Sequence, residues 1–313
     1  MDIKQLRSFL LIAESGSVTK AAESQHVVQP AISRQLRLLE ESLGLPLFTR
    51  KRQGMELTDA GKVLVEYAQR AIRELDLANE ELKAARGHLT GDVTLGLLPS
   101  TCDLLVSPLL KSLGRDHPHV HVRVSVGYTG HLQQWLENGE IDIALLYDPT
   151  SFARLSIQPL LEEKLFLVGL PDSGLRTDSP VTLAQLDTKP LILPSAPHGI
   201  RKLVENGFTA SGMRLSVAAE TNAMSVQKNL VLNGFGFTIL PSCAVFDDLK
   251  CGALAAAPIE KPDMYRRITL ALPANGRSSS AVRYVVNELL GQMESKVRNG
   301  QWPWATWLHG AKN

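Results

Sequence analysis

Five residues near the start of the chain carry side chains that could contact nucleic acid. Gln29, Pro30, Ser33, Arg34 and Arg37 fall within one short segment. Arginine suits guanine O6 and N7, and hydroxyl and amide groups can reach phosphates or base edges. An ordinary solvated helix face is the alternative for such a segment, and charge alone does not decide between them. The chemistry that these residues could perform is recognition of DNA.

The surrounding pattern predicts three short helices that would position these residues. Apolar residues recur at three- and four-residue steps over residues 3–13, and Gly16 ends that helix. Ser17 can cap a second helix, and Pro30 fits the first turn of a third. Two short helices joined by a tight turn form a helix-turn-helix, whose second helix enters the major groove.

A basic hairpin is predicted directly after the third helix. The segment from Thr49 to Gly54 contains Arg50, Lys51 and Arg52 and is flanked by apolar residues. It is typical of a wing, in which Arg50 and Arg52 would lie along the phosphate backbone or in the minor groove. The whole chain of 313 residues carries a net charge of only +1, so this local excess of basic residues is informative. Residues 1–58 are therefore predicted to form a winged helix-turn-helix DNA-binding domain.

A long helix is predicted for the following segment, residues 59–90. Thr58 can cap it, and neither proline nor glycine occurs from Lys62 to Arg86. One apolar stripe repeats along it at heptad spacing, formed by Leu64, Ala68, Ala71, Leu75, Ala78 and Leu82. A narrow stripe on so long a helix favours pairing with the same helix of a second subunit, which predicts a homodimer.

The remaining residues, 91–313, alternate strand and helix patterns, which indicates an α/β fold with a doubly wound sheet. The predicted strands are Val93 to Leu97, Val120 to Val126, Ile141 to Leu146, Leu165 to Val168, Leu191 to Leu193, Leu215 to Ala218, Phe237 to Leu240 and Ile268 to Leu272. In such sheets ligands bind beyond the carboxyl ends of the strands.

Motifs over about sixty residues resemble the DNA-binding signature of the LysR family of transcriptional regulators. They are Ala21-Ala22, Gln29-Pro30-Ala31-Ile32-Ser33, Leu38-Leu39-Glu40, Leu43-Gly44, Leu47-Phe48, Leu57-Thr58 and Ala60-Gly61. The resemblance implies a transcription regulator that binds double-stranded promoter DNA as a homodimer or homotetramer, contacts RNA polymerase and responds to a small-molecule effector. Ala144 to Asp148 and Leu165 to Gly169 are also similar to the branch that contains the nitrogen assimilation control regulator.

The same resemblance implies that residues 91–313 form two α/β lobes like those of periplasmic binding proteins. Lobe I would hold about residues 91–163 and 268–313, and lobe II about 164–267, with the effector in the cleft between them. Polar groups at the strand ends suit a polar or anionic metabolite. The candidate effector-binding residues are Ser100, Thr101, Thr129, Tyr147, Ser195, His198, Arg201, Thr221, Asn222, Phe237 and Thr238. For Ser100, Thr129 and Thr221 an N-cap role is an equally good interpretation.

An enzyme is not indicated by the remaining chemistry. No nucleophile with a matching base and no phosphate-binding glycine loop stands out, so no cofactor is predicted. His117, His119 and His121 alternate, but Pro118 interrupts them and no acidic residue or cysteine follows at a matching spacing, so no metal site is expected. No signal or membrane-spanning segment is apparent, and we expect a cytoplasmic protein.

Two other classes of function compete with the regulator. A solute receptor of the binding-protein type would not need a winged helix-turn-helix. An effector-independent regulator, in which the protein's own side chains fill the cleft, stays open. Three of the four tryptophans lie in the tail, at Trp302, Trp304 and Trp307, and we expect this tail to dock on a neighbouring surface.

Overall fold

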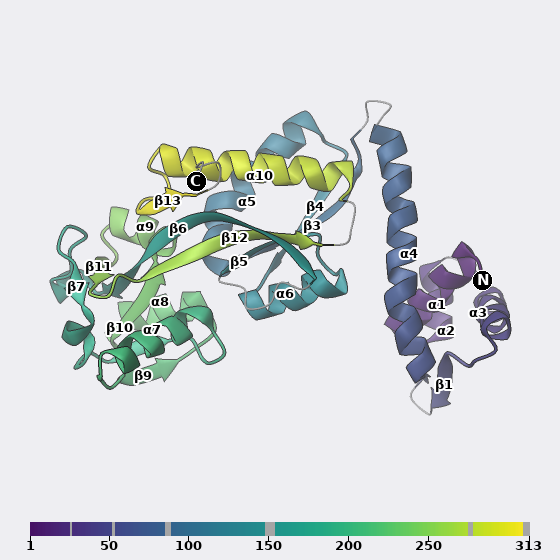
Figure 1. Cartoon of the computed structure of the whole chain (residues 1–313), viewed down its shortest axis with the longest axis horizontal. Coiled ribbons are helices and arrows are strands. Elements are labelled where there is room, and N and C mark those ends of the chain that lie inside the picture. The colour runs from purple at the N-terminus through teal and green to yellow at the C-terminus, as the bar shows by residue number, and fades with distance from the viewer. Residues whose placement is uncertain (26, 52–53, 85–88, 148–153, 275–277, 309–313) are drawn as a thin grey trace. The chain divides into compact units, whose positions relative to one another are not determined.

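The computed structural model describes residues 1–25, 27–51, 54–84, 89–147, 154–274 and 278–308. The chain divides into two compact units, Met1–His88 and Leu89–Asn313, which are drawn in Figure 1. No helix among these residues has the length and apolar character needed to cross a membrane.

The N-terminal unit consists of three short helices, a two-stranded hairpin and one long helix. The elements are α1 Ile3–Ser15, α2 Val18–Ser24, α3 Gln29–Leu43, β1 Phe48–Lys51, β2 Gly54–Leu57 and α4 Asp59–Ala84. Their order confirms the predicted helix-turn-helix, wing and linker helix.

Local capping signals set the boundaries of these helices. Ser17 accepts a hydrogen bond from the Lys20 N–H and caps α2, and the Thr58 hydroxyl accepts one from the Gly61 N–H at the start of α4. Gly16 ends α1 at φ 63°, a conformation that favours glycine. Its carbonyl accepts the Met55 N–H at 2.9 Å, which attaches the wing to α1.

The core of this unit lies where the three short helices meet the hairpin. Phe9, Ile32 and Leu39 are fully buried there. The carboxylate of Glu40 accepts the Leu47 N–H at 2.7 Å and thereby joins α3 to the chain entering the wing. α3 is thus held from its buried face, and the opposite face carries exposed side chains.

The C-terminal unit is a mixed α/β structure, as predicted. Its lobe I elements are β3 Gly91–Leu97, α5 Pro99–Asp116, β4 Val120–Val126, α6 Thr129–Asn138, β5 Ile143–Tyr147, β12 Tyr265–Pro273, α10 Ser280–Arg298 and β13 Ala305–Trp307. Those of lobe II are η1 Pro171–Ser173, β7 Val181–Thr182, η2 Leu183–Leu186, β8 Leu191–Leu193, α7 Gly199–Ala210, β9 Val217–Glu220, α8 Met224–Leu232, β10 Phe237–Pro241, α9 Ser242–Lys250 and β11 Ala255–Glu260.

One long strand, β6 Leu155–Gly169, connects the two lobes. Residues 155–164 pair with β12, and residues 165–169 pair with β10 and β11. The strands follow the order β4-β3-β5-β12-β6-β10-β8-β9, and β6 crosses from lobe I to lobe II in Figure 1. The predicted strand at Leu165 to Val168 covers only the second half of β6. The sequence did not indicate the first half, because it lacks the continuous apolar run expected of a buried strand.

The tryptophan-containing tail docks on its own chain. β13 pairs antiparallel with β6, and Trp302 is almost completely buried in the lobe I core. Trp304 lies against the Phe166 ring, with centroids 4.8 Å apart. The prediction that the tail docks on a surface is confirmed, and the surface is the crossing strand.

Candidate functional sites

The predicted DNA-contacting residues lie at the N-terminal end of α3. Gln29, Pro30, Arg34 and Arg37 are exposed and Ser33 is half-buried. The Gln29 amide donates to the Ser33 hydroxyl at 3.5 Å, and Arg37 faces Glu41 one turn on, at 3.5 Å. Such an exposed ion pair is weak, so Arg37 can exchange its partner for a phosphate.

The wing follows α3 as a short antiparallel hairpin. Thr49 pairs with Glu56 and Arg50 with Met55. Arg50 therefore lies on β1, and its side chain is outside the described part, as is the whole of Arg52. Both residues stay predictions from the sequence.

The heptad stripe of α4 divides into two parts, which corrects the prediction of one continuous interface. Ala68 is only 1% exposed and Leu64 packs beside it, because this end of α4 covers the core of its own unit. Ala71, Leu75 and Ala78 are exposed beyond that core. An intersubunit surface could therefore use the stripe from Ala71 onward.

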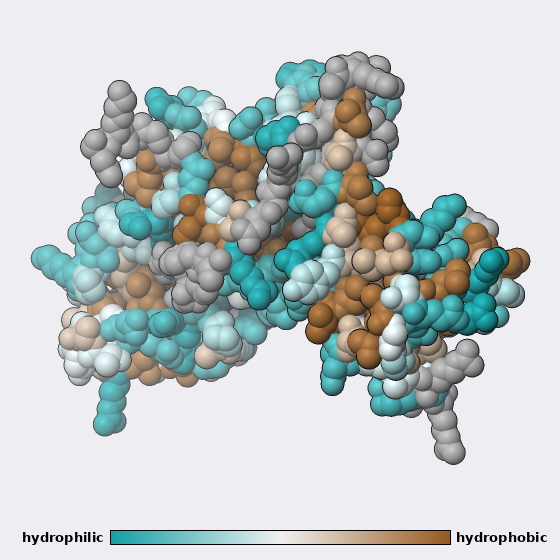
Figure 2. Space-filling view, turned by 45° about the vertical axis from the view of Figure 1, so that its right-hand side comes forward, coloured by the Kyte–Doolittle hydropathy of each residue, from teal (hydrophilic) through white to brown (hydrophobic). Residues whose placement is uncertain are grey.

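The last residue of the stripe and two residues beside it also present exposed apolar side chains. Leu82 is 68% exposed, and Val63 and Tyr67 lie exposed on the first half of the helix. Figure 2 shows hydrophobic residues gathered along the N-terminal unit on the face it displays. A row of exposed apolar residues on one helix is typical of a surface that another chain covers.

A pocket of about 70 Å³ lies within the C-terminal unit, between its two lobes. Four of the predicted effector-binding residues line it: Ser100, Thr129 and Tyr147 from lobe I, and His198 from lobe II. Most of the other lining residues are leucine, isoleucine, methionine and proline side chains. The pocket is consequently apolar over most of its wall, with a few convergent polar groups.

Contacts across the lobes close one side of this pocket. The Tyr128 ring meets the His198 ring edge-on at 4.6 Å, and the Tyr128 hydroxyl donates to the Asn222 carbonyl. Gly199 lies against Tyr147 so closely that a Cβ atom there would come within 2.3 Å of the ring. Only glycine permits this approach of α7 to lobe I.

Seven predicted effector-binding residues do not line the pocket. Two of them, Thr101 and Thr238, are completely buried, and their hydroxyls donate to the carbonyls of Leu98 and Ile192 at 2.9 and 2.7 Å. Their positions at strand ends suggested that they face the cleft. In the structure their side chains instead point into the protein and hydrogen-bond to backbone carbonyls.

The other five residues contact other parts of the chain, and all but Asn222 do so within lobe II. Arg201 forms ion pairs with Glu205 and Glu220, at 2.6 and 2.8 Å. The remaining four make local contacts. The Ser195 N–H donates to the Asn222 side-chain oxygen, and the Thr221 hydroxyl accepts the Ala223 N–H. The Phe237 ring lies against the Lys189 ammonium group.

Of the three residues for which an N-cap role was an alternative, Ser100, Thr129 and Thr221, at most Thr221 has this role. Leu98 and Tyr128 occupy the N-cap positions of α5 and α6, so Ser100 and Thr129 do not cap these helices. Thr221 accepts a backbone N–H just before α8, which is a capping type of contact.

His198 is neutral at physiological pH. Burial, and secondarily the positive charge of Arg266, lower the pKa of its imidazole to about 4. Its Nδ1 accepts the Ile200 N–H at 3.2 Å, so the ring caps α7. The pocket therefore receives no charge from this side chain.

Sequence reasoning missed the charged residue of the pocket, Arg266. Its side chain is 4% exposed and forms a fully buried ion pair with Glu163. Arg266 lies on β12 and Glu163 on β6, the strands that connect the lobes. Burial disfavours the charge of Arg266, but the Glu163 carboxylate outweighs it, and the pKa of the guanidinium is raised. Arg266 and Glu163 both lie just outside the predicted strands, and their charged neighbours Arg267 and Glu162 give them the pattern of an ordinary solvated segment.

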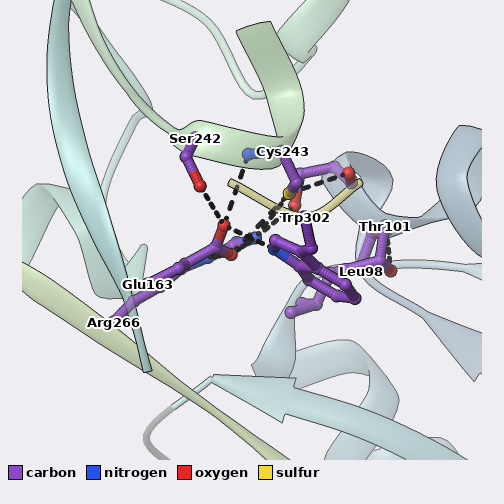
Figure 3. Close-up of polar contacts among 8 residues, drawn as sticks. Leu98, Thr101, Glu163, Ser242, Cys243, Arg266 and Trp302 are labelled. Atoms are coloured by element: carbon purple, nitrogen blue, oxygen red, sulfur yellow. Dashed lines mark hydrogen bonds and ion pairs between the residues drawn. The ribbon is translucent and has the colours of Figure 1, made fainter. Parts of the chain in front are cut away.

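Figure 3 shows the network around this ion pair. Glu163 Oε2 accepts hydrogen bonds from the Ser242 hydroxyl at 3.0 Å, the Cys243 N–H at 3.3 Å and the Trp302 indole at 3.0 Å. Arg266 Nη2 donates to the Ser100 hydroxyl at 2.8 Å. Burial raises the pKa of the Cys243 thiol, so it stays protonated. Both lobes and the tail thus meet at one buried charge pair.

Replacing Thr129 by valine should destabilise the protein rather than remove a ligand contact. The Thr129 hydroxyl accepts the Tyr147 N–H at 2.9 Å and donates to the Tyr147 carbonyl at 3.1 Å. Losing it should cost about 1–3 kcal/mol of the free energy of unfolding, because a backbone group is left unpaired. Thermal unfolding measures this loss. Thr129→Ser keeps the hydroxyl and is the control, and equal melting temperatures for the valine and serine variants would contradict this role.

Comparison with known proteins agrees with the order of these two units. Residues 3–62 match the bacterial regulatory helix-turn-helix protein family model of the LysR family, and residues 86–294 match the LysR substrate binding domain model. The chain is 31% identical to the HTH-type transcriptional regulator BbuR of Bordetella bronchiseptica, over 97% of this chain and 93% of that one. It is 30% identical to the nitrogen assimilation regulatory protein nac of Escherichia coli, over 96% of this chain and 99% of that one.

Solved structures share the fold. Full-length OxyR of Pseudomonas aeruginosa superposes with a TM-score of 0.74 at 23% identity, covering 94% of this chain and 95% of that one. CbnR in complex with its target DNA gives a TM-score of 0.65 at 22% identity, covering 94% and 99%. The chain belongs to the LysR family of DNA-binding transcriptional regulators, which are not enzymes. The expected similarity to the nitrogen assimilation regulator is confirmed at 30% identity.

Proposed function

We propose that this regulator binds operator DNA as a homodimer, assembled further into a homotetramer, and that a small molecule bound between the lobes controls it. The observation that carries this proposal is the coexistence, in one chain, of an exposed basic face on α3 and a pocket lined from both lobes. α3 and the wing contact the duplex, and the exposed part of the α4 stripe joins two subunits. RNA polymerase is the expected partner at the promoter, as implied by the family.

The role of the effector follows from the position of the pocket. A ligand that touches both lobes favours one relative arrangement of them over others, by as much as its affinity differs between these arrangements. A change of lobe arrangement in each subunit can then alter the spacing of the recognition helices on DNA. A pocket without an effector is the competing proposal, and it predicts operator affinity that no small molecule changes.

Arg34→Ala should weaken operator binding while the fold survives. Arg34 is exposed on α3, and the loss of one base or phosphate contact should cost about 1–3 kcal/mol, which is roughly a 5- to 150-fold loss of affinity. Affinity is measured at fixed salt on a duplex that the wild-type protein selects in vitro from random sequences. Circular dichroism establishes that the variant is folded.

Arg115→Ala is the matched control, because Arg115 is also exposed but lies in the C-terminal unit, beside Asp116. Affinity should fall for Arg34→Ala only. If both variants bind the duplex as the parent does, α3 is not the DNA-reading element. A wild-type protein that selects no duplex would contradict sequence-specific DNA binding itself.

A further inference from the structure

One nitrogen of the Arg266 guanidinium has no hydrogen-bond partner among the residues that the structure describes. Nε donates to Glu163 at 2.6 Å, and Nη2 donates to Ser100 at 2.8 Å and to the Cys243 sulfur at 3.4 Å. Within the described part of the chain, Nη1 makes no hydrogen bond, although the side chain is 96% buried and lines the pocket. Nη1 is not one of the fully enclosed polar atoms without a partner, so it is accessible from the pocket and can donate to a ligand there. The free nitrogen therefore marks a place for an acceptor supplied by a ligand.

Glu163 Oε1 compensates the charge of Arg266 by contacting both Nε and Nη2, and it leaves Nη1 available as a donor. Both oxygens of this carboxylate are occupied, and Oε2 takes all its hydrogen bonds from the neutral donors Ser242, Cys243 and Trp302. These donors stabilise the carboxylate charge on the side remote from Arg266. The arginine is held in place by Glu163 and still presents donors to the pocket.

The rest of the pocket wall favours a negatively charged ligand over a positively charged one. Among the described residues that line the pocket, Arg266 is the only one charged at neutral pH, since His198 is neutral and no aspartate or glutamate lies there. The first residues of α6 and α7, namely Thr129 and Gly130, and Gly199 and Ile200, also line it. The N-terminal ends of these helices present the positive end of the helix dipole, which favours an anion.

We propose that Arg266 is the specificity-determining residue of this pocket and that its ligand is a small monocarboxylate with a short apolar chain. The carboxylate accepts from Nη1, and the apolar chain lies against the side chains of Leu98, Ile200, Met224 and Ile239. This inference rests on the proposed effector control and names the ligand class and the residue that reads it. Glu163 is a positioning residue, which acts by orienting the guanidinium.

The volume of the pocket limits the size of the ligand. Each water-sized position takes about 10–15 Å³ of such a volume, so a cavity of about 70 Å³ holds roughly five to seven heavy atoms. Propanoate, butanoate and pentanoate have this size, and a ligand of more than about seven heavy atoms does not fit without opening of the lobes. The three neutral amides of these acids have the same shape without the charge and are the matched probes.

The test measures the melting temperature of the full-length protein with each acid and each amide at equal ionic strength. A fitting acid should raise it by about 3–6 °C at ten times its Kd, and the amide by less than a third of that. The double variant Glu163→Gln/Arg266→Met removes both charges together and should lose the difference between acid and amide. The control Glu162→Gln/Arg267→Met removes the neighbouring exposed ion pair on the same two strands and should keep it.

Equal stabilisation by acids and amides, no stabilisation by any acid, or a difference that survives in Glu163→Gln/Arg266→Met would overturn the assignment. Should that double variant fail to fold, Arg266→Lys serves instead, since it keeps the charge but loses the planar fork; it should bind the acid at least tenfold more weakly. Operator affinity measured with the same acid tests the proposed function separately. An acid that binds through Arg266 and leaves operator affinity unchanged supports the assignment and refutes effector control.

Discussion

Replacing Leu75 by aspartate should convert the proposed dimer of this regulator into monomers. Leu75 is 41% exposed on α4, beyond the part of the helix that covers the core of its own unit, so the folded subunit tolerates a charge there. At a paired helix face the same charge is buried opposite its copy without a partner. The cost should be at least about 3 kcal/mol, which raises the dimer dissociation constant more than 100-fold. Light scattering at micromolar concentration measures the mass.

Gln69→Asp is the control for this prediction. Gln69 is exposed on α4 and lies outside the heptad stripe, so it receives the same charge without entering the helix pairing. Its mass should equal that of the parent. Operator affinity should fall for Leu75→Asp alone, because a monomer presents one recognition helix to a two-part site. A variant of Leu75 that keeps the parental mass would show that α4 does not pair through this face.

Replacing Arg266 alone by methionine should strongly destabilise the C-terminal unit. It leaves the fully buried Glu163 carboxylate without its counter-charge, and such a loss costs about 3–5 kcal/mol. For a unit of this size we expect the melting temperature to fall by about 6–20 °C. Calorimetry of the full-length protein, in which the transition of this unit is followed, gives the value.

The double variant Glu163→Gln/Arg266→Met should recover most of this loss. A glutamine oxygen can accept the hydrogen bonds from Ser242, Cys243 and Trp302 that Glu163 Oε2 accepts, and the methionine fills the space of the arginine. The losses of unfolding free energy in Glu163→Gln and in Arg266→Met should therefore not add in the double variant. If the double variant is as unstable as the sum of the single variants, the two side chains act independently, and the network in Figure 3 is not a unit.

The architecture of the N-terminal unit could be predicted because its signals are local. The cap at Ser17, the stop at Gly16 and the proline in the first turn of α3 act within one or two helical turns. Nearly all residues that decide a helix boundary are thus neighbours in the sequence. In the heptad stripe the sequence indicated the spacing correctly, but which of its members lie in the core of the same subunit depends on distant contacts, as Ala68 shows.

The sequence by itself determined the family, the order of the elements and the region in which a pocket would lie. Only the tertiary structure decided which polar groups meet there. Thr238 and Thr101 follow strand-end rules as well as Ser100 does, yet their hydroxyls bind backbone carbonyls. Arg266 meets Glu163 and Ser100 across 103 and 166 residues of chain. A periodic pattern records burial over a few residues, whereas the partner of a buried charge depends on where the crossing strands bring distant segments together.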